Sequence, residues 1–524
     1  MKCPRCQTEN REGLRFCEDC GARFAVTYET SLFPELEYTF KHALTHEVAY
    51  GSILHERRRA LHARIVETIE KSYAAQIAEH VERLGYHALR AESWDRAIAY
   101  LLQAGAKAAS RSANVEAIDH LTKGLATLQN ISDGPDRLRL ELDLQIALGP
   151  VLMTTRGYGA PEVESAYARA RELCRRVGED PELFAVLHGL WLHYWLRGEI
   201  PAVLDLAQQL YDLAHRAGDR PLRLVAYDVM GEVAVYVGDF TAARSYMEQC
   251  VSLYDPSQHR ALGFRYGGYD PGMAARAIGA HALWCLGFPD QALAWSRGAV
   301  ALARDLSQPT TLAFALGHAG ILHYLRQEPR LTREVAEEAL ALSAGRGLEF
   351  WKAFAEILRG WSLVRQRRGP EGIESMRHGL EGYRVNGELE SPIWLAMMAD
   401  AYLVEGAPHE GLSAVAEALD LVNAMGVRFA EAELYRLRGE LLLARAGAAA
   451  EDAESAFRRA LEVAAGQKAQ CLELRAAMSL ARLEQARGER KLAHQTLAEV
   501  YAGFTEGFDT SDLREARTLL EELS

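Results

Sequence analysis

The sequence predicts an all-α protein, built as a solenoid of stacked helix pairs with a small metal-binding segment at its N-terminus. Three observations predict this architecture. Segments of similar pattern recur about every 40 residues, apolar residues are spaced as on helices from residue 74 onward, and two C-x-x-C motifs lie near the N-terminus. A chain of 524 residues is long enough for such a stack, in which neighbouring units bury a continuous core.

The N-terminal cysteines are the first element. Cys3, Cys6, Cys17 and Cys20 form the motifs CPRC and CEDC. Two such turns facing each other supply four thiolates in a tetrahedral array, which suits Zn²⁺, and a segment this short needs the metal for its folding energy. A redox dithiol or unpaired thiols are the alternatives, but the paired spacing favours structural zinc. We therefore predict a zinc ribbon over residues 1–24.

A linker and a charged helix follow the ribbon. We expect a linker over residues 25–37 and a helical segment over residues 38–73. The letters HERRRALHARIVETIE read as an amphipathic helix whose Leu61, Ile65 and Ile69 face inward. Its four arginines, Arg57, Arg58, Arg59 and Arg64, could meet phosphates. The favoured alternative is a solvated face balanced by the neighbouring glutamates.

Residues 74–524 form the predicted helical repeats. One position of the repeat, a small residue in most units, falls at Val163, Val203, Ala243, Ala292, Arg333, Gly372, Gly411, Ala453 and Ala493. The successive steps are 40, 40, 49, 41, 39, 39, 42 and 40. Small residues, such as Ala243 and Cys250 on either side of Met247, allow two helices to approach closely. The units resemble tetratricopeptide repeats, lengthened from about 34 to about 40 residues.

Two aromatic clusters and one loop are candidate ligand sites. The clusters are Trp191, His193, Tyr194 and Trp195 on one helix, and His318, His323 and Tyr324 on another. Packing between helices is the alternative reading of both. The long step of 49 comes from residues 255–276, where Gly267, Gly268, Pro271 and Gly272 predict a loop. Loops that project from a solenoid often bind ligands, so Tyr266, Tyr269 and Asp270 form a possible ligand loop.

The junction between the ribbon and the repeats carries a family resemblance. The stretch from Tyr28 to Ala106, which begins YETSLFPELEYTFKHALTHEVAYGSILHERRRALHARIVETIE, resembles the junction after the nucleotide-binding part of bacterial class III adenylate/guanylate cyclase proteins. That family joins a zinc ribbon, a cyclase domain, an AAA-like ATPase module and a tetratricopeptide tail. The N-terminal ribbon and the ending GFTEGFDTSDLREARTLLEEL are also similar to it. The resemblance implies that residues 38–73 are a remnant of the ATPase-to-repeat junction.

The catalytic parts of that family are missing from this sequence. A P-loop needs Gly-Lys-Ser or Gly-Lys-Thr to hold phosphates, and the chain contains neither. About seventeen residues, from Cys20 to Glu37, separate the ribbon from the junction, too few for a cyclase domain with its metal-binding aspartate pair.

Composition restricts the partners. With a formal net charge of -13 the chain lacks a generally basic surface, which argues against a nucleic-acid partner. The chain has no run of eighteen apolar residues and no secretory signal in MKCPRCQTEN, so we expect a cytoplasmic protein without a membrane partner.

The sequence thus predicts a non-catalytic tetratricopeptide-like scaffold or sensor, which binds a protein, a peptide or a small effector on its concave surface. Structural Zn²⁺ is the expected cofactor. The alternative is a cyclase-related, ATP-dependent signalling protein that acts with a complete relative.

Overall fold

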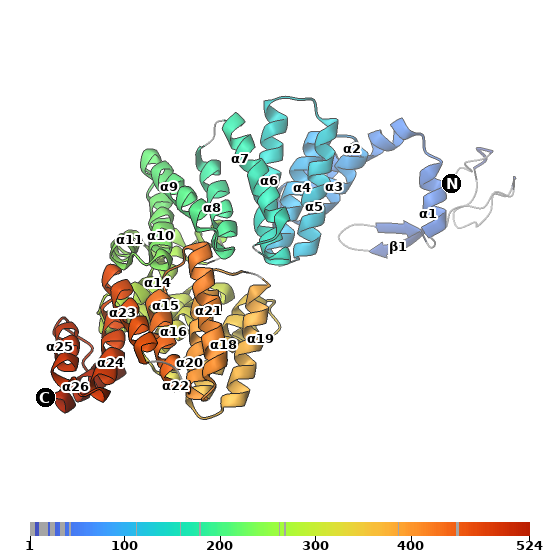
Figure 1. Cartoon of the computed structure of the whole chain (residues 1–524). Helices are drawn as coiled ribbons and strands as arrows, with labels where there is room; N and C mark the ends of the chain where they lie inside the picture. The colour runs from blue at the N-terminus through green and yellow to red at the C-terminus, as the bar shows by residue number, and fades with distance from the viewer. Residues whose placement is uncertain are drawn as a thin grey trace. The chain divides into compact units, whose positions relative to one another are not determined.

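The computed structural model describes residues 6–9, 19–20, 27–31, 37–40, 43–111, 113–157, 159–177, 180–260, 262–266, 269–385, 387–446 and 450–524. They belong to two compact units, Met1–Asp133 and Gly134–Ser524. Helices make up most of each unit's described part (Figure 1). None of the described helices is both long enough and apolar enough to span a membrane.

The first unit contains a pair of strands that the sequence analysis did not predict. β1 (Thr27–Ser31) pairs antiparallel with β2 (Glu37–Phe40). The segment 25–37, expected as a linker, thus contributes a strand. The reason is local: TYETS and EYTF are rich in Thr, Tyr and Phe, whose branched and aromatic side chains suit a pleated backbone.

The helices of the first unit are α1 (Ala43–Gly51), α2 (His55–Ser72), the 3₁₀ helix η1 (Ala74–Glu79), α3 (Val81–Arg90), α4 (Trp94–Ser110), α5 (Asn114–Thr127) and the 3₁₀ helix η2 (Leu128–Asn130). The buried face of α2 consists of His62, Val66 and Ile69. The expected inward positions Leu61 and Ile65 are wrong, because these side chains are 41% and 36% exposed. The apolar stripe lies one residue further along, at spacings of four and three.

The second unit is a stack of helices without a described strand (Figure 1). Its helices are α6 (Pro135–Arg156), α7 (Pro161–Val177), α8 (Asp180–Leu196), α9 (Ile200–Ala217), α10 (Arg220–Val237), α11 (Phe240–Leu253), α12 (Pro256–His259), α13 (Leu262–Arg265), α14 (Pro271–Cys285), α15 (Pro289–Leu306), α16 (Pro309–Leu325), α17 (Pro329–Ser343), α18 (Glu349–Arg365), α19 (Gly369–Arg384), α20 (Ser391–Val404), α21 (Pro408–Met425), α22 (Glu431–Ala444), α23 (Ala450–Gly466), α24 (Gln470–Ala486), α25 (Arg490–Tyr501) and α26 (Ser511–Leu523).

The second unit has an inner and an outer layer of helices. From α14 to α24, the first helix of each pair contacts the first helices of the pairs before and after it. These inner helices are buried on most sides, as in α16, where every residue from Ala313 to Leu325 is buried. The second helices are amphipathic, as in α15, whose buried stripe includes Ala292, Ser296 and Ala299. The chain is therefore a tetratricopeptide-like solenoid of helix pairs.

The expected repeat register holds except in one unit. Ala243, Met247 and Cys250 are completely buried, as the pattern predicts. In α17 the buried position is Thr332 rather than Arg333, which lies at the surface and pairs with Glu337 at 2.7 Å. With Thr332 in place, the neighbouring steps become 332 − 292 = 40 and 372 − 332 = 40.

Close approach of helices depends on small residues. A Cβ atom added to Gly360 in α18 would lie 2.5 Å from the carbonyl oxygen of Gly372 in α19, and one added to Gly372 would lie 2.5 Å from the carbonyl oxygen of Gly360. Either added atom would force the two helices apart, because the obstacle is a backbone oxygen, which cannot rotate away as a flexible side chain can. The two glycines therefore set the distance between these helices.

Repeats that are far apart in sequence touch within the second unit. The backbone N–H of Glu388 donates to the carbonyl of Leu196 at the end of α8, over 2.8 Å. The N–H of Arg428 donates to the carbonyl of Tyr236 near the end of α10, over 2.7 Å. The buried Arg475 of α24 donates to the carbonyl of Leu325 at the end of α16. The solenoid thus winds back on itself, and successive turns are joined by hydrogen bonds.

Candidate ligand-binding pocket

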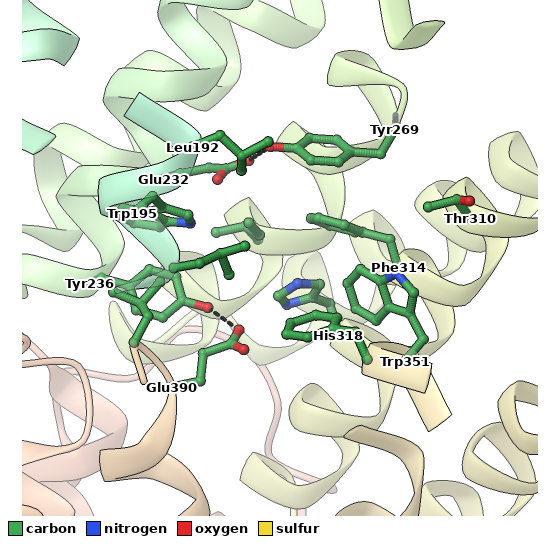
Figure 2. Close-up of a pocket in the computed structure, with 14 residues that line it drawn as sticks. Leu192, Trp195, Glu232, Tyr236, Tyr269, Thr310, Phe314, His318, Trp351 and Glu390 are labelled. Atoms are coloured by element: carbon green, nitrogen blue, oxygen red, sulfur yellow. Dashed lines mark hydrogen bonds between the residues drawn. The ribbon is translucent and has the colours of Figure 1, made fainter. Parts of the chain in front are cut away.

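A pocket lies among the inner helices of the second unit (Figure 2). Helical spacing aligns its lining: α10 supplies Glu232 and Tyr236 four residues apart, and α16 supplies Thr310, Phe314 and His318 at intervals of four. The remaining walls come from α8, α14, the first turn of α18 and the residues before α20. The pocket therefore combines side chains that are almost 200 residues apart in sequence.

Six of the fourteen residues that line the pocket are aromatic: Trp195, Tyr236, Tyr269, Phe314, Phe350 and Trp351. The ring of Phe314 lies 4.7 Å from that of Tyr269 and 5.3 Å from that of Trp351, measured between centroids. The cavity volume is about 50 Å³. At roughly 10–15 Å³ for each water molecule, it has room for about four waters or one small functional group.

Two buried carboxyl groups lie in these walls. Glu232 is 1% exposed, and the hydroxyl of Tyr269 lies 3.5 Å from its Oε1. Glu390 is 5% exposed and accepts a hydrogen bond of 2.5 Å from the hydroxyl of Tyr236 (Figure 2). Burial raises the pKa of Glu232 to about 8, helped by Glu390 and opposed by the Tyr269 hydroxyl. Burial also raises the pKa of Glu390 to about 7.

A third acid and a histidine add unsatisfied polar atoms. Asp228 lies one helical turn before Glu232, and burial, followed by the proximity of Glu232 and Asp270, raises its pKa well above the ordinary value. Burial lowers the pKa of His318, so its ring is neutral at physiological pH. Among the described residues, neither Asp228 Oδ1 nor His318 Nδ1 has a hydrogen-bond partner. Such orphaned atoms are expensive inside a protein, and they often mark a place where something else binds.

Each of the two aromatic clusters predicted from the sequence contributes one residue to the pocket. Trp195 and His318 line the pocket. Trp191 is fully buried and stacks on Trp195, with ring centroids 5.2 Å apart. Tyr194 donates a hydrogen bond to Glu164 over 2.7 Å, and His193 is buried 3.8 Å from that carboxylate.

Both remaining members of the second cluster are structural. The Nδ1 atom of His323 lies 2.6 Å from Glu328 Oε2, and Tyr324 packs edge-on against Trp361. The packing interpretation thus describes most of both clusters, and Trp195 and His318 remain candidates for ligand contact because they line the pocket.

Two of the three residues of the possible ligand loop, Tyr266 and Asp270, are buried, and Tyr269 is half-buried. Tyr266 is 3% exposed and packs against Phe184 and His188. Asp270 caps α14 by accepting from the backbone N–H of Met273 over 2.8 Å, and it also accepts from the hydroxyl of Tyr254. Of the three candidates, only Tyr269 lines the pocket.

The expected loop is also shorter than residues 255–276. Pro271 and Gly272, which suggested a loop, form the first turn of α14, since proline is favoured at the start of a helix. Short helices α12 and α13 occupy part of the rest, while Gly267 and Gly268 lie outside the described residues.

Four residues of the lining, Glu232, Glu390, Phe314 and Trp351, were not predicted from the sequence. A signal for Glu232 was available: the letters VAYDVMGEVAVYV place two acids in an otherwise apolar helix, where charges are rarely buried without a role. No comparable signal marks Glu390, because it lies in a connection between helices.

The predicted zinc ligands are described only in part. Cys3 and Cys17 lie outside the described residues. The thiol of Cys6 lies 3.3 Å from the hydroxyl of Thr8, which donates to Asp19 over 2.8 Å. Thr8 lies two residues after Cys6, and Asp19 directly precedes Cys20, so this hydrogen bond joins a residue near Cys6 to the neighbour of Cys20.

Larger hollows have a different character. One of about 840 Å³ lies among α21, α22 and α23, and its lining mixes acids with Arg438, Arg445 and Arg459. Another, of about 670 Å³, lies in the first unit beside Tyr50 and His62. Neither contains a buried acid with a raised pKa, so the aromatic pocket is the stronger candidate site.

Comparison with known proteins yields few matches in sequence and several in fold. No family model matches the chain. An uncharacterized protein of Rhizobium meliloti (strain 1021) is 24% identical over 450 residues, which cover 85% of this chain. The chain spans 43% of the length of that relative.

Several solved structures are similar to the chain. The Rap protein complexed with competence and sporulation factor has a TM-score of 0.47 and 12% identity, covering 82% of this chain and 99% of that one. The quorum sensor NprR from B. thuringiensis, in its apo form, has a TM-score of 0.42 and 12% identity, covering 70% and 99%. A signal transduction ATPase with numerous domains from Pyrococcus horikoshii, which carries a tetratricopeptide repeat sensor, has a TM-score of 0.39 and 13% identity, covering 76% and 56%.

Proposed function

We propose that the second unit is a non-catalytic sensor module, which binds a small effector, or one side chain of a peptide, in the aromatic pocket. The observation that carries this proposal is the pocket itself, with its aromatic rings, two buried glutamates and the Nδ1 atom of His318, which lacks a partner among the described residues. Apolar concave sites with a few convergent polar groups are typical of ligand pockets. A protein or peptide partner would lie on the concave repeat surface and insert one group here.

The position of the pocket gives a ligand a means of acting on the whole unit. Glu390 and Leu389 lie next to Glu388, whose backbone bonds to the end of α8. The hydroxyl of Tyr236 donates to Glu390, and the backbone carbonyl of Tyr236 accepts from the N–H of Arg428. A ligand that moves either side chain therefore alters the contacts between turns of the solenoid. This coupling is what a sensor needs, because a ligand shifts a conformational equilibrium only by binding one state better than the other.

A screen with a blocked pocket tests the proposal. The purified chain is screened by thermal shift against a panel of metabolites and short peptides. Thr310→Trp places a bulky side chain in the lining, and Glu334→Trp, at a surface position of α17, is the matched control. We expect ligands that stabilise the wild type and the control but not Thr310→Trp. If every stabilising compound acts equally on all three proteins, the pocket is not the site.

The N-terminal segment has a structural role in this proposal. Cys3, Cys6, Cys17 and Cys20 would hold one Zn²⁺, which links two turns too small to fold alone. The contact between Thr8 and Asp19 supports this arrangement, because it joins residues that lie close in sequence to Cys6 and Cys20. Zinc analysis of the purified chain, before and after Cys20→Ser, tests it.

The cyclase-related reading is a second proposal. The resemblance of residues 28–106 and the match to a longer relative, 43% of which is covered, favour descent from a multidomain signalling protein. In that case the chain would act in the cytoplasm beside a complete relative. Measurement of adenylate cyclase and ATPase activity of the purified chain distinguishes the sensor from the enzyme. Activity that is lost when a residue of this chain is substituted would favour the enzyme.

A further inference from the structure

The ionisable groups of the pocket lining that can carry a negative charge have no basic partner in that lining. Its lining residues, all of them described, include the carboxyl groups of Glu232 and Glu390 and no lysine or arginine. Asp228 lies near Glu232 and near Asp270, and Arg276, outside the lining, lies near Asp270. His318 contributes no positive charge, because burial keeps it neutral. Any charge that balances these acids must come from outside the lining.

Another buried glutamate of the same solenoid, Glu433, is paired with arginines. Glu433 of α22 is 5% exposed, and Arg436 binds both of its oxygens, at 2.7 and 2.9 Å. The guanidinium of Arg475 lies 3.7 Å away. These arginines lower the pKa of Glu433 despite its burial. Among the described residues, neither Glu232 nor Glu390 is paired with an arginine, although both are at least as buried as Glu433.

The aromatic walls suit a cation as well. The faces of tryptophan, tyrosine and phenylalanine rings attract positive charge, and the attraction grows where water is excluded. Trp195 and Tyr236 lie beside the two glutamates, while Phe314 and Trp351 form the facing wall (Figure 2). The free Nδ1 of His318, in the tautomer protonated on Nε2, can accept a hydrogen bond from an N–H group.

The size of the cavity limits the cation. About 50 Å³ accepts a single ammonium or guanidinium group, and it is too small for a drug-sized ligand, whose sites span roughly 300–1,000 Å³. The rest of such a ligand must extend along the aromatic side chains or outward. A short apolar stem therefore fits the walls better than a polar one.

We infer that the pocket recognises an ammonium or guanidinium group on an apolar stem, which is placed against Glu232 and Glu390 and enclosed by aromatic rings. This inference rests on the proposed function and specifies its ligand class. The group can belong to a free alkyl amine or to a lysine or arginine side chain of a peptide. The chemistry is the same in both cases.

Four small probes and two peptides test the ligand class. The probes share one stem: n-butylammonium, n-butylguanidinium, neutral n-butanol and anionic butyrate, titrated by calorimetry at pH 8 and constant ionic strength. A pentapeptide of glycine with a central lysine, and one with a central norleucine, distinguish a peptide source from a free amine. We expect each cation to bind the wild-type chain at least tenfold more tightly than butanol, and butyrate not to bind. A cation no tighter than butanol overturns the inference, and this comparison needs no variant.

Variants locate the binding. In Glu232→Gln/Glu390→Gln the preference for the cation over butanol should fall below about threefold, while Glu349→Gln should retain it. Glu349 lies next to Phe350 and is exposed to solvent, so it controls for net charge. Cation binding that persists in the double variant overturns the inference. If instead an uncharged compound binds the wild type and fails with Thr310→Trp, the proposed function stands and the cation class is wrong.

Discussion

Replacing Glu232 by glutamine should remove a pH dependence of stability that the wild type carries. The folded protein holds a proton on this carboxyl up to a pKa of about 8, whereas the unfolded chain releases it near 4.5. The unfolded state therefore binds fewer protons between these values, and stability falls as the pH rises. Glutamine resembles the protonated carboxyl in shape and has no proton to lose.

The size of the effect follows from the two pKa values. For one site that titrates at 4.5 when unfolded and about 8 when folded, the free energy of unfolding falls by about 3 kcal/mol between pH 5.5 and 8.5. An unfolding entropy of about 2.1 cal/mol/K per residue, over residues 134–524, converts this to about 4 °C in Tm. Burial also raises the pKa values of three nearby acids, which are present in both proteins: Asp228 on the same helix, Asp270 before α14 and Glu390 before α20.

Calorimetry of the full chain at pH 5.5, 7.0 and 8.5 measures this difference. The wild type should lose about 4 °C more than Glu232→Gln between the lowest and highest pH. Glu349→Gln, an exposed substitution with the same change of charge, should follow the wild type. Equal losses for the wild type and Glu232→Gln would refute the reasoning, because they would show that Glu232 ionises in the folded protein as easily as in water.

Three further outcomes are expected. Arg475→Leu should cost about 3–5 kcal/mol in urea unfolding, since it leaves the half-buried Asp512 carboxylate unpaired and breaks a bond between turns, whereas exposed Arg482→Leu should cost less than about 1 kcal/mol. Gly360→Ala should destabilise by about 1–3 kcal/mol, while Gly298→Ala, whose added Cβ meets only the Arg276 side chain at 3.8 Å, should not destabilise. Cys20→Ser should abolish binding of one equivalent of zinc, measured by atomic absorption, without lowering the Tm of the repeats; full zinc retention would contradict the ribbon.

The solenoid was predictable because its determinants are local. Small residues at Ala243 and Cys250, with Met247 between them, mark a close helix contact in the sequence, and all three are buried. The period of about 40 residues then fixes how many pairs stack. Two of the errors were shifts of one helical position, at Thr332 and on α2, where neighbouring apolar or polar residues fit the pattern almost equally well.

The pocket depended on tertiary structure. Trp195, Glu232, His318 and Glu390 meet only because small rotations between successive pairs add up to a turn of the solenoid, and no periodicity in the sequence encodes that sum. The sequence by itself determined that helix pairs stack and which face of each outer helix is buried, since the spacing of apolar side chains decides both. Tertiary structure alone decided which inner helices face one another and left two glutamates without a counter-charge, because burial and the choice of neighbours arise only when distant turns pack together.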